Sequence, residues 1–146
     1  MSIFSAMNIS ASGMTAQRLR TDIISQNIAN VNTTRDENGE PYKRKTVVFA
    51  EKNVSAFRDV LRTTAGTTGN GVKVTAIVED NKTPMNKVYD PSHPDADEDG
   101  YVSYPNVNTV TEMTNLIDAS RSYEANVTAF NATKNMALKG LEVGTK

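Results

Sequence analysis

Apolar residues recur at helical spacing in two segments, one toward each end of the chain. The first runs from about Ile3 to Asn30, with a heptad seam at Ile9, Ser12, Ala16, Leu19, Ile23 and Gln26. The second runs from about Val110 to Leu141, with a seam at Met113, Leu116, Ser120, Tyr123, Val127, Phe130, Lys134, Ala137 and Leu141. Such spacing, alternating between three and four residues, predicts long helices that pack like a coiled coil. Pro105 and Asn106 precede the second helix, where a chain can turn and cap it.

The stretch between these helices has the period of two that is typical of β-strands. Lys43 to Glu51 is a strand candidate, and Val72 to Glu79 is another that follows the loop AGTTGNG. Ser55 to Arg62 is expected to form a short helical turn. After Pro84, a segment rich in proline and aspartate is expected to be an extended loop pinned by Tyr89, Tyr101 and Tyr104.

The sequence therefore predicts an α+β fold with long N- and C-terminal helices. Residues 1–34 and 106–146 are expected to form a coiled-coil-like α-domain of terminal helices. Residues 35–105 are expected to form a small β-rich insert with the extended loop.

Uncharged amides lie among the few apolar residues of the first helix, at Gln26, Asn27 and Asn30. The seams could be covered by an antiparallel pairing of the two helices within one chain, or by neighbouring subunits. Buried amides lower stability but fix register and partner, which favours an assembly. We therefore predict an assembly interface at Ile9, Ala16, Leu19, Ile23, Gln26, Asn27, Asn30, Met113, Leu116, Ser120, Tyr123, Val127, Phe130 and Leu141.

Composition narrows the classes of function. Hydrophobic residues make up 38% and aromatic residues 6%, without tryptophan, which is lean for a self-sufficient core. A net charge of −1 argues against nucleic acid as a partner. The chain has no cysteine, no apolar run long enough to span a membrane, and no N-terminal pattern of a cleaved secretory signal.

The acidic stretch from Asp95 to Gly100 matches the first half of an EF-hand loop. Its twelfth position is Asn106 rather than a bidentate glutamate, and Pro91, Pro94 and Pro105 disfavour the flanking helices. We therefore expect a solvated acidic turn and no bound metal or cofactor.

His93 is the only histidine, so a catalytic zinc site lacks its usual ligands. Ser92 and Asp95 lie near it, but the segment has no nucleophile-elbow glycines, and we expect His93 to pack or hydrogen-bond within its loop. The basic run Lys43-Arg44-Lys45 is expected to form a solvated face or to guard a strand edge. We predict neither an enzyme nor a small-molecule substrate.

Several stretches resemble flagellar axial proteins. SGMTAQRLRTDIISQNIANVNTTR, Ser12 to Arg35, resembles the N-terminal signature shared by rod, hook and hook-associated proteins. GEPYKRKTVVF (Gly39 to Phe49), VYDPSHPDADEDGYVSYPNVNTVTEM (Val88 to Met113) and IDASRSYEANV (Ile117 to Val127) resemble the FlgC-type proximal rod subunits. The resemblance covers nearly the whole chain.

The resemblance implies a structural subunit of the proximal rod of the bacterial flagellar basal body. Such subunits leave the cell through the flagellar type III export apparatus without a cleaved signal, and polymerise helically into the periplasm-spanning drive shaft that transmits motor torque. The implied partners are copies of the chain, other proximal and distal rod subunits, the rod-base adaptor protein and the MS-ring. Weakly hydrophobic, amide-rich helices would suit a chain that travels unfolded and becomes stable only among its neighbours.

Two other interpretations stay open from the residues alone. One is a self-contained periplasmic or cytoplasmic binding module that uses the acidic loop, and it predicts a folded monomer stabilised by calcium. The other is a small hydrolase that uses His93, and it predicts a pocket around that residue.

Overall fold

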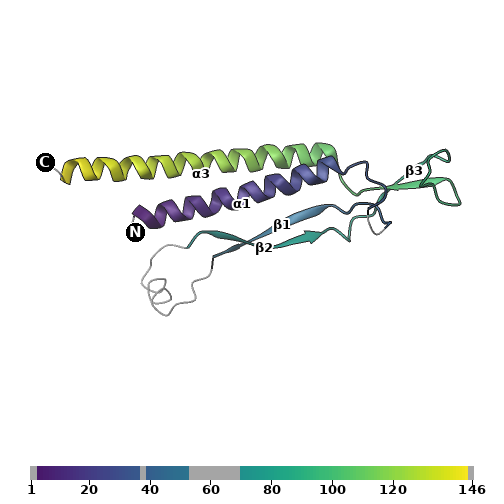
Figure 1. Ribbon diagram of the computed structural model, residues 1–146, viewed down its shortest axis with the longest axis horizontal. Helices are drawn as coiled ribbons and strands as arrows, with labels where there is room; N and C mark the ends of the chain where they lie inside the picture. The colour runs from purple at the N-terminus through teal and green to yellow at the C-terminus, as the bar shows by residue number, and fades with distance from the viewer. Residues whose placement is uncertain (1–2, 37–38, 53–69, 145–146) are drawn as a thin grey trace. The chain divides into compact units, whose positions relative to one another are not determined.

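The computed structural model describes residues 3–36, 39–52 and 70–144. The elements follow in the order α1 (Ile3–Ala29), β1 (Lys45–Glu51), β2 (Val72–Glu79), β3 (Asn86–Tyr89), β4 (Tyr101–Tyr104) and α3 (Thr109–Gly144) (Figure 1). Strand β1 pairs with β2, and β3 pairs with β4. The predicted α+β class and both predicted long helices are confirmed. The turn expected over Ser55 to Arg62 lies outside the described residues.

The chain divides into two compact units. Unit 1 comprises Met1–Leu19, Val48–Ala76 and Ala119–Lys146, and unit 2 comprises Arg20–Val47 and Ile77–Asp118. Each unit therefore combines parts of both helices with part of the β1–β2 pair. The division into a terminal-helix domain and an insert, expected from the sequence, groups the residues differently and stays a prediction.

Within each unit, α1 lies beside α3 (Figure 1). In unit 1, a Cβ atom added to Gly13 would stand only 2.6 Å from Oδ1 of Asn126. In unit 2, Asn27 donates a hydrogen bond to Glu112. Since the higher-numbered residue of α1 meets the lower-numbered residue of α3, the helices are antiparallel. The pairing within one chain that the sequence left open is therefore present.

At several positions of α3, the residue buried within the chain is the one just before the predicted seam residue. Ala119 and Thr133 are buried, whereas the adjacent seam residues Ser120 and Lys134 are exposed. The residues on the buried side are small or polar, which allows two helices to approach closely, as Gly13 does on α1. Several large apolar side chains, among them Met113 and Ile117, remain on the outside of α3.

Few apolar residues of the described chain are buried, and most of them are small: Ala16, Ile23, Ile24, Val102, Val107 and Ala119. Nearly as many polar residues are buried with them: Ser10, Asn27, Asn106, Glu112 and Thr133. Polar contacts thus hold the fold together alongside apolar burial. None of the described helices is long and apolar enough to span a membrane.

The segment expected to be an extended loop contains a loop over residues 90–100, flanked by two short strands that the sequence did not predict. Strands β3 and β4 pair antiparallel, with Val88 opposite Val102 and Tyr89 opposite Tyr101. Gly100, with φ of +80°, closes the turn, and a Cβ there would stand 3.0 Å from the Tyr89 ring. Strands of four residues separated by prolines carry too little alternation to be recognised in the sequence.

Gly71 generates a testable prediction in unit 1. Its φ is +90°, and a Cβ there would stand 2.3 Å from Oγ of Ser12 and 3.3 Å from the backbone of Ile9. The Ser12 hydroxyl also accepts a hydrogen bond from the backbone N–H of Val72. Gly71→Ala is therefore expected to lower the free energy of unfolding by about 1–2 kcal/mol, measured by urea unfolding.

Gly140→Ala is the matched control, because an added Cβ meets nothing within 4 Å in the α3 helix. That change should leave stability unaltered or raise it by up to about 1 kcal/mol. Equal stabilities of the two variants would contradict the assignment of strain to Gly71.

Candidate functional site

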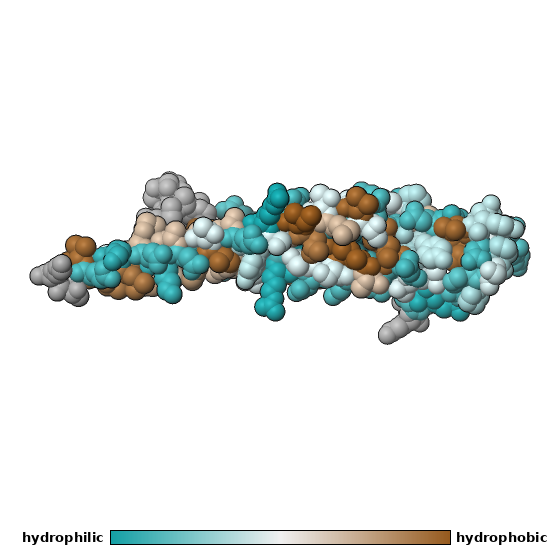
Figure 2. Space-filling model, turned by 90° about the horizontal axis from the view of Figure 1, so that it is seen from above, coloured by the Kyte–Doolittle hydropathy of each residue, from teal (hydrophilic) through white to brown (hydrophobic). Residues whose placement is uncertain are grey.

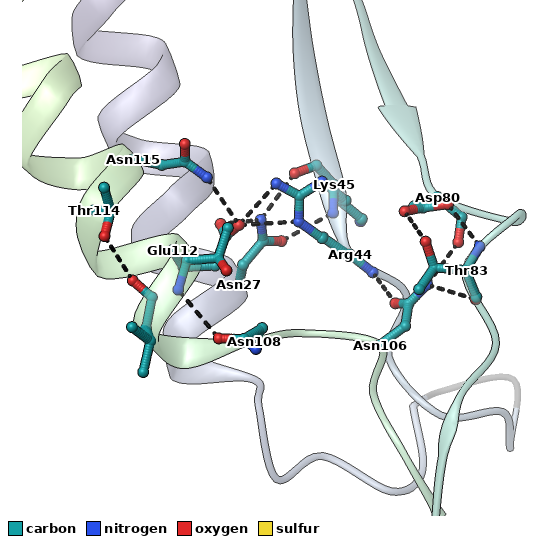
Figure 3. Close-up of polar contacts among 12 residues, drawn as sticks. Asn27, Arg44, Lys45, Asp80, Thr83, Asn106, Asn108, Glu112, Thr114 and Asn115 are labelled. Atoms are coloured by element: carbon teal, nitrogen blue, oxygen red, sulfur yellow. Dashed lines mark hydrogen bonds and ion pairs between the residues drawn. The ribbon is translucent and has the colours of Figure 1, made fainter.

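Unit 2 contains a cluster of polar side chains where the end of α1, the start of β1 and the start of α3 meet (Figure 3). We call it the polar junction; it consists of Asn27, Tyr42, Arg44, Lys45, Asn106 and Glu112. These side chains come from segments far apart in the sequence. The junction therefore fixes the terminal helices and the first strand to one another within this unit.

Asn27 is fully buried and uses its whole amide group. Its Nδ2 donates to the Lys45 carbonyl at 2.8 Å and to Oε2 of Glu112 at 2.9 Å. Its Oδ1 accepts from the Lys45 N–H and from the Tyr42 hydroxyl, both at 2.9 Å. Toward Lys45, the side chain thus pairs as a neighbouring strand would. An aspartate could not donate these bonds, and an apolar residue could make none of them.

Asn106 also binds the backbone where the chain enters β1, on the edge opposite to Asn27. Its Oδ1 accepts from the backbone N–H of Arg44 at 2.9 Å. Its Nδ2 donates to the carbonyls of Asp80 and Thr83, at 2.8 and 3.1 Å. Because the Arg44 carbonyl also accepts from the Asp80 N–H, Asn106 extends the β1–β2 ladder by side-chain bonds.

Glu112 has no exposed surface, and its carboxylate is satisfied by three residues. Oε1 accepts from Nε and Nη2 of Arg44 at 2.9 and 2.8 Å, and from Asn115 at 3.4 Å. The Asn27 amide donates to Oε2. A buried carboxylate needs such compensation, because removing a charge from water is costly. These bonds join Glu112 of α3 to the end of α1 and to the entry of β1.

The position of Glu112 at the N-terminus of α3 stabilises its negative charge. Glu112 is the acidic residue of the first turn, where the partial positive charge of a helix N-terminus favours an anion. Asn108 is the N-cap, since its Oδ1 accepts from the N–H of Thr111 at 3.1 Å. The expectation that Pro105 and Asn106 turn and cap this helix was wrong for Asn106, whose side chain is engaged with Arg44 and Asp80.

Tyr42 contributes an ionisable group to the junction. Burial raises the pKa of its hydroxyl, and the negative charges of Glu79 and Glu112 raise it further. The hydroxyl remains protonated at neutral pH and donates to Asn27. Lys45 lies over the Tyr42 ring, with its Nζ 5.6 Å from the ring centroid.

In the acidic loop between β3 and β4, the carboxylates of Asp95 and Asp97 bind other groups of the chain. Oδ1 of Asp97 accepts from the N–H groups of Asp99 and Tyr101. Asp95 binds Arg35 at 2.8 Å and accepts from the Thr34 hydroxyl. No group of three or more histidine, cysteine or acidic side chains that could hold a metal occurs among the described residues. Asp95 and Asp97, at the first and third positions of the EF-hand pattern, thus bind groups of the protein.

His93 packs and hydrogen-bonds within its loop, as predicted. Its Nδ1 accepts from the N–H of Asp95 at 3.1 Å, and its ring stands edge-on to Tyr104 at 6.4 Å. The Ser92 hydroxyl donates to Asp90, not to His93, so the triad considered from the sequence is not formed.

The residues predicted for an assembly interface fall into three groups by exposure. Buried within the chain are Ala16, Ile23 and Asn27. Half-buried are Ile9, Leu19, Asn30, Leu116, Val127 and Phe130. Exposed are Gln26, Met113, Ser120, Tyr123 and Leu141. The three amides differ accordingly: Asn27 joins the junction, Asn30 donates to the carbonyl of Gln26 at the end of α1, and Gln26 faces outward.

Sequence reasoning missed Arg44 and Glu112. Arg44 stands in a basic run that was expected to be a solvated face or to guard a strand edge, yet its side chain is 24% exposed and pairs with a buried carboxylate. The available signal was Glu112 itself, an acidic residue one position before a predicted seam residue. A carboxylate on the inner side of a helix requires a cation from elsewhere in the chain.

Removing the buried ion pair one partner at a time should be strongly destabilising. Glu112→Leu leaves the Arg44 guanidinium without its partner, and we expect the free energy of unfolding to fall by about 3–5 kcal/mol. The double variant Arg44→Met with Glu112→Leu should recover most of that loss, because no unpaired charge remains. Urea unfolding of the full chain measures both.

The exposed pair Lys43–Glu40 is the control, because its side chains are 31% and 62% exposed. Lys43→Met should cause only a small loss of stability, because an exposed ion pair contributes little. A loss of that small size for Glu112→Leu would contradict the role assigned to the junction.

Because the pKa of the Tyr42 hydroxyl is raised in the folded chain, we expect a loss of stability in alkaline solution. As pH rises above the ordinary tyrosine value of about 10, the unfolded chain loses its phenolic proton before the folded chain does. The contribution of Tyr42 to stability is therefore fully present below about pH 10, and it is lost as pH rises through the pKa of Tyr42 in the folded chain. Tyr42→Phe should show a smaller fall, measured as unfolding free energy between pH 8 and 11. Tyr89→Phe, at a 64% exposed position, should leave the profile unchanged; identical profiles for all three chains would refute the assignment.

Comparison with known proteins shows to which family the chain belongs. A family model described as "Flagella basal body rod protein" matches residues 7–35, and one described as "Flagellar basal body rod FlgEFG protein C-terminal" matches residues 98–143. The flagellar basal-body rod protein FlgC of Bacillus subtilis is 50% identical over 99% of each chain. The FlgC proteins of Borreliella burgdorferi and Escherichia coli O157:H7 are 44% and 38% identical, over 98% and 99% of each chain. The resemblance noted in the sequence is confirmed, and the chain belongs to the FlgC family of flagellar basal-body rod proteins.

Proposed function

We propose that the chain is a structural subunit of the proximal rod of the flagellar basal body and acts without catalysis. It polymerises helically with copies of itself and with other rod proteins to form the shaft that transmits motor torque. The near full-length similarity to FlgC proteins carries this proposal.

The outer surface of α3 supports it. Val110, Met113 and Ile117 lie at helical spacing on one side and are 72%, 59% and 53% exposed. Figure 2 shows apolar groups standing among polar ones on the face that it draws. Burying a large apolar side chain contributes about 1.5–3 kcal/mol, so a neighbouring subunit that covers these three residues would gain substantially. We call them the α3 stripe.

The finer expectations rest on the same family membership. The partners are the proximal and distal rod subunits, the rod-base adaptor protein and the MS-ring, and the chain reaches them through the flagellar type III export apparatus without a cleaved signal. The small buried apolar core is compatible with export of an unfolded chain, because helices that bury little surface are marginal until neighbours cover them.

Substitutions in the α3 stripe test the proposed function. In a flagellated bacterium deleted for its own member of the family, the double variant Met113→Asp with Ile117→Asp should be exported but excluded from basal bodies. The reason is that two charges would be buried without partners. Motility and immunoblots of purified basal bodies measure the effect. Stripe residues are better targets than Ile23, which is only 5% exposed, so a charge there would also damage the isolated chain.

Thr111→Asp is the matched control, an exposed position in the first turn of the same helix, where an acid is tolerated. It should assemble normally. Motile cells whose basal bodies contain the stripe variant would show that this surface is not an assembly contact.

A further inference from the structure

Each sheet in the described part of the chain consists of only two strands, β1 with β2 and β3 with β4. An isolated pair of strands is marginally stable, and a third strand stabilises it. The outer edge of such a pair carries backbone N–H and C=O groups that can bind a strand of another molecule. The edges that the chain itself leaves uncovered are therefore candidates for contacts between copies.

The outer edge of β4 is occupied by the loop that precedes this strand. The N–H of Tyr101 donates to Oδ1 of Asp97 at 2.7 Å, and the Tyr101 carbonyl accepts from the N–H of Asp97 at 2.9 Å. The backbone groups of Tyr101 thus point away from β3. Since Tyr89 lies opposite Tyr101, its backbone groups point away from β4. The bond from the N–H of Asp90 to the Gly100 carbonyl at 3.0 Å agrees with this alternation.

The outer edge of β3 is open. It carries the backbone groups of Lys87 and Tyr89, and no strand in the part of the chain that the structure describes pairs with it. All residues of β3 are exposed, with Val88 at 49% and Tyr89 at 64%. A strand from another molecule can therefore reach this edge.

The outer edge of β2 is also open where this strand lies in unit 2, over residues 77–79. The N–H of Asp80 donates to the Arg44 carbonyl at 2.8 Å, so the backbone groups of Asp80 point toward β1. Those of Glu79 and, by the alternation of the strand, of Ile77 point away from β1. Ile77 and Val78 are 47% and 48% exposed, and Glu79 is exposed as well.

The two open edges match each other when they are aligned antiparallel. Three pairs then lie opposite one another, one of opposite charge, one aromatic with β-branched and one of two valines: Lys87 with Glu79, Tyr89 with Ile77, and Val88 with Val78. Cross-strand pairs of these kinds stabilise a sheet. A shift by two residues would place Lys87 opposite Ile77 or Asn81 and lose the ion pair. The contact of Glu79 with its own Lys45 is long, at 3.7 Å, and both side chains are at least 34% exposed, so Glu79 can accept a second cation.

We propose that β3 of one copy adds to the open edge of β2 on a second copy, as an antiparallel third strand. The inference rests on the proposed function, since it names one contact by which neighbouring rod subunits join. Lys87 and Tyr89 exchange backbone hydrogen bonds with the second copy, and Val88 lies against its Val78. Each copy has both edges, so the contact is heterologous and can continue from copy to copy.

Disulfide formation between two single-cysteine chains tests the contact, because the chain has no cysteine of its own. One full chain carries Val78→Cys, and a second, with a different epitope tag, carries Val88→Cys. Both are expressed in cells deleted for their own member of the family. The two valines form a non-hydrogen-bonded pair, in which Cα atoms about 4.5 Å apart allow a disulfide. After oxidation of isolated basal bodies, non-reducing immunoblots should show a product that carries both tags.

Ile77→Cys is the matched control for Val78→Cys. The two positions are 47% and 48% exposed, but their side chains lie on opposite faces of β2. Combined with Val88→Cys, Ile77→Cys should therefore give about tenfold less product or lower. The Val88→Cys chain expressed alone should give no disulfide dimer, because a heterologous contact does not bring two copies of this residue together.

Exchanging the charges tests the register. Lys87→Glu in the Val88→Cys chain should lower the yield of the product by about threefold or more, because like charges then lie opposite each other. Glu79→Lys in the Val78→Cys chain should restore the yield.

Hydrogen exchange of the unmodified chain gives a second measurement, which decides the question if the cysteine chains do not enter basal bodies. Peptides that contain β3 or residues 77–79 should exchange about tenfold more slowly in isolated basal bodies than in the purified chain. The reason is that their outward N–H groups become hydrogen-bonded.

Four results would overturn the inference and leave the proposed function standing. They are equal products from Ile77→Cys and Val78→Cys, a dimer from Val88→Cys alone, no product from cysteine chains that are present in basal bodies, or unchanged exchange at both edges. Absence of the unmodified chain from basal bodies would overturn both.

Discussion

A carboxylate buried without access to water has to be neutralised where it stands, and unit 2 is organised around that requirement. Glu112 comes from the first turn of α3, its cation Arg44 from the entry to β1, and its amide partner Asn27 from the end of α1. The Asn27 side chain also holds the backbone N–H and carbonyl of Lys45. Loss of one member would leave charged or polar groups of the others unsatisfied, so the three segments hold together cooperatively.

This arrangement explains why so little apolar surface is buried. Where Ala119 and Thr133 face inward, the helices approach closely but gain little from hydrophobic burial. The larger side chains Met113 and Ile117 remain outside, where a monomer gains nothing from them. Register is thus set inside the chain by polar contacts, while larger apolar side chains remain exposed. That division suits a member of a rod-protein family, because orientation is fixed before association.

Much of the fold could be predicted from periodicity. Both helices and strand β2 follow from local patterns of three, four and two residues. The hairpin at Val88 and Val102 could not be recognised, because four-residue strands show hardly any alternation. The sequence could not predict that α3 buries Ala119 within the chain rather than Ser120, since both are equally compatible with a heptad and only packing decides between them.

The polar junction was out of reach for a different reason. Asn27 stood out as an amide in an apolar helix, but its partners lie 18 and 85 residues away. The pairing of Arg44 with Glu112 spans 68 residues, and no local pattern encodes it. Sequence could indicate that an amide or a carboxylate lay on an inner face. Only the folded chain shows which group forms the hydrogen bond or ion pair with it.

The Asn27 side chain also covers part of the outer edge of β1. Arg44 turns its N–H and carbonyl toward Asn106 and Asp80, so those of Lys45 point to the opposite edge, which no described strand covers. An open edge invites a strand from another molecule, and this is a common route to aggregation. The Asn27 amide occupies the Lys45 donor and acceptor together. A helix side chain therefore occupies the backbone groups at which β-pairing with another molecule would begin.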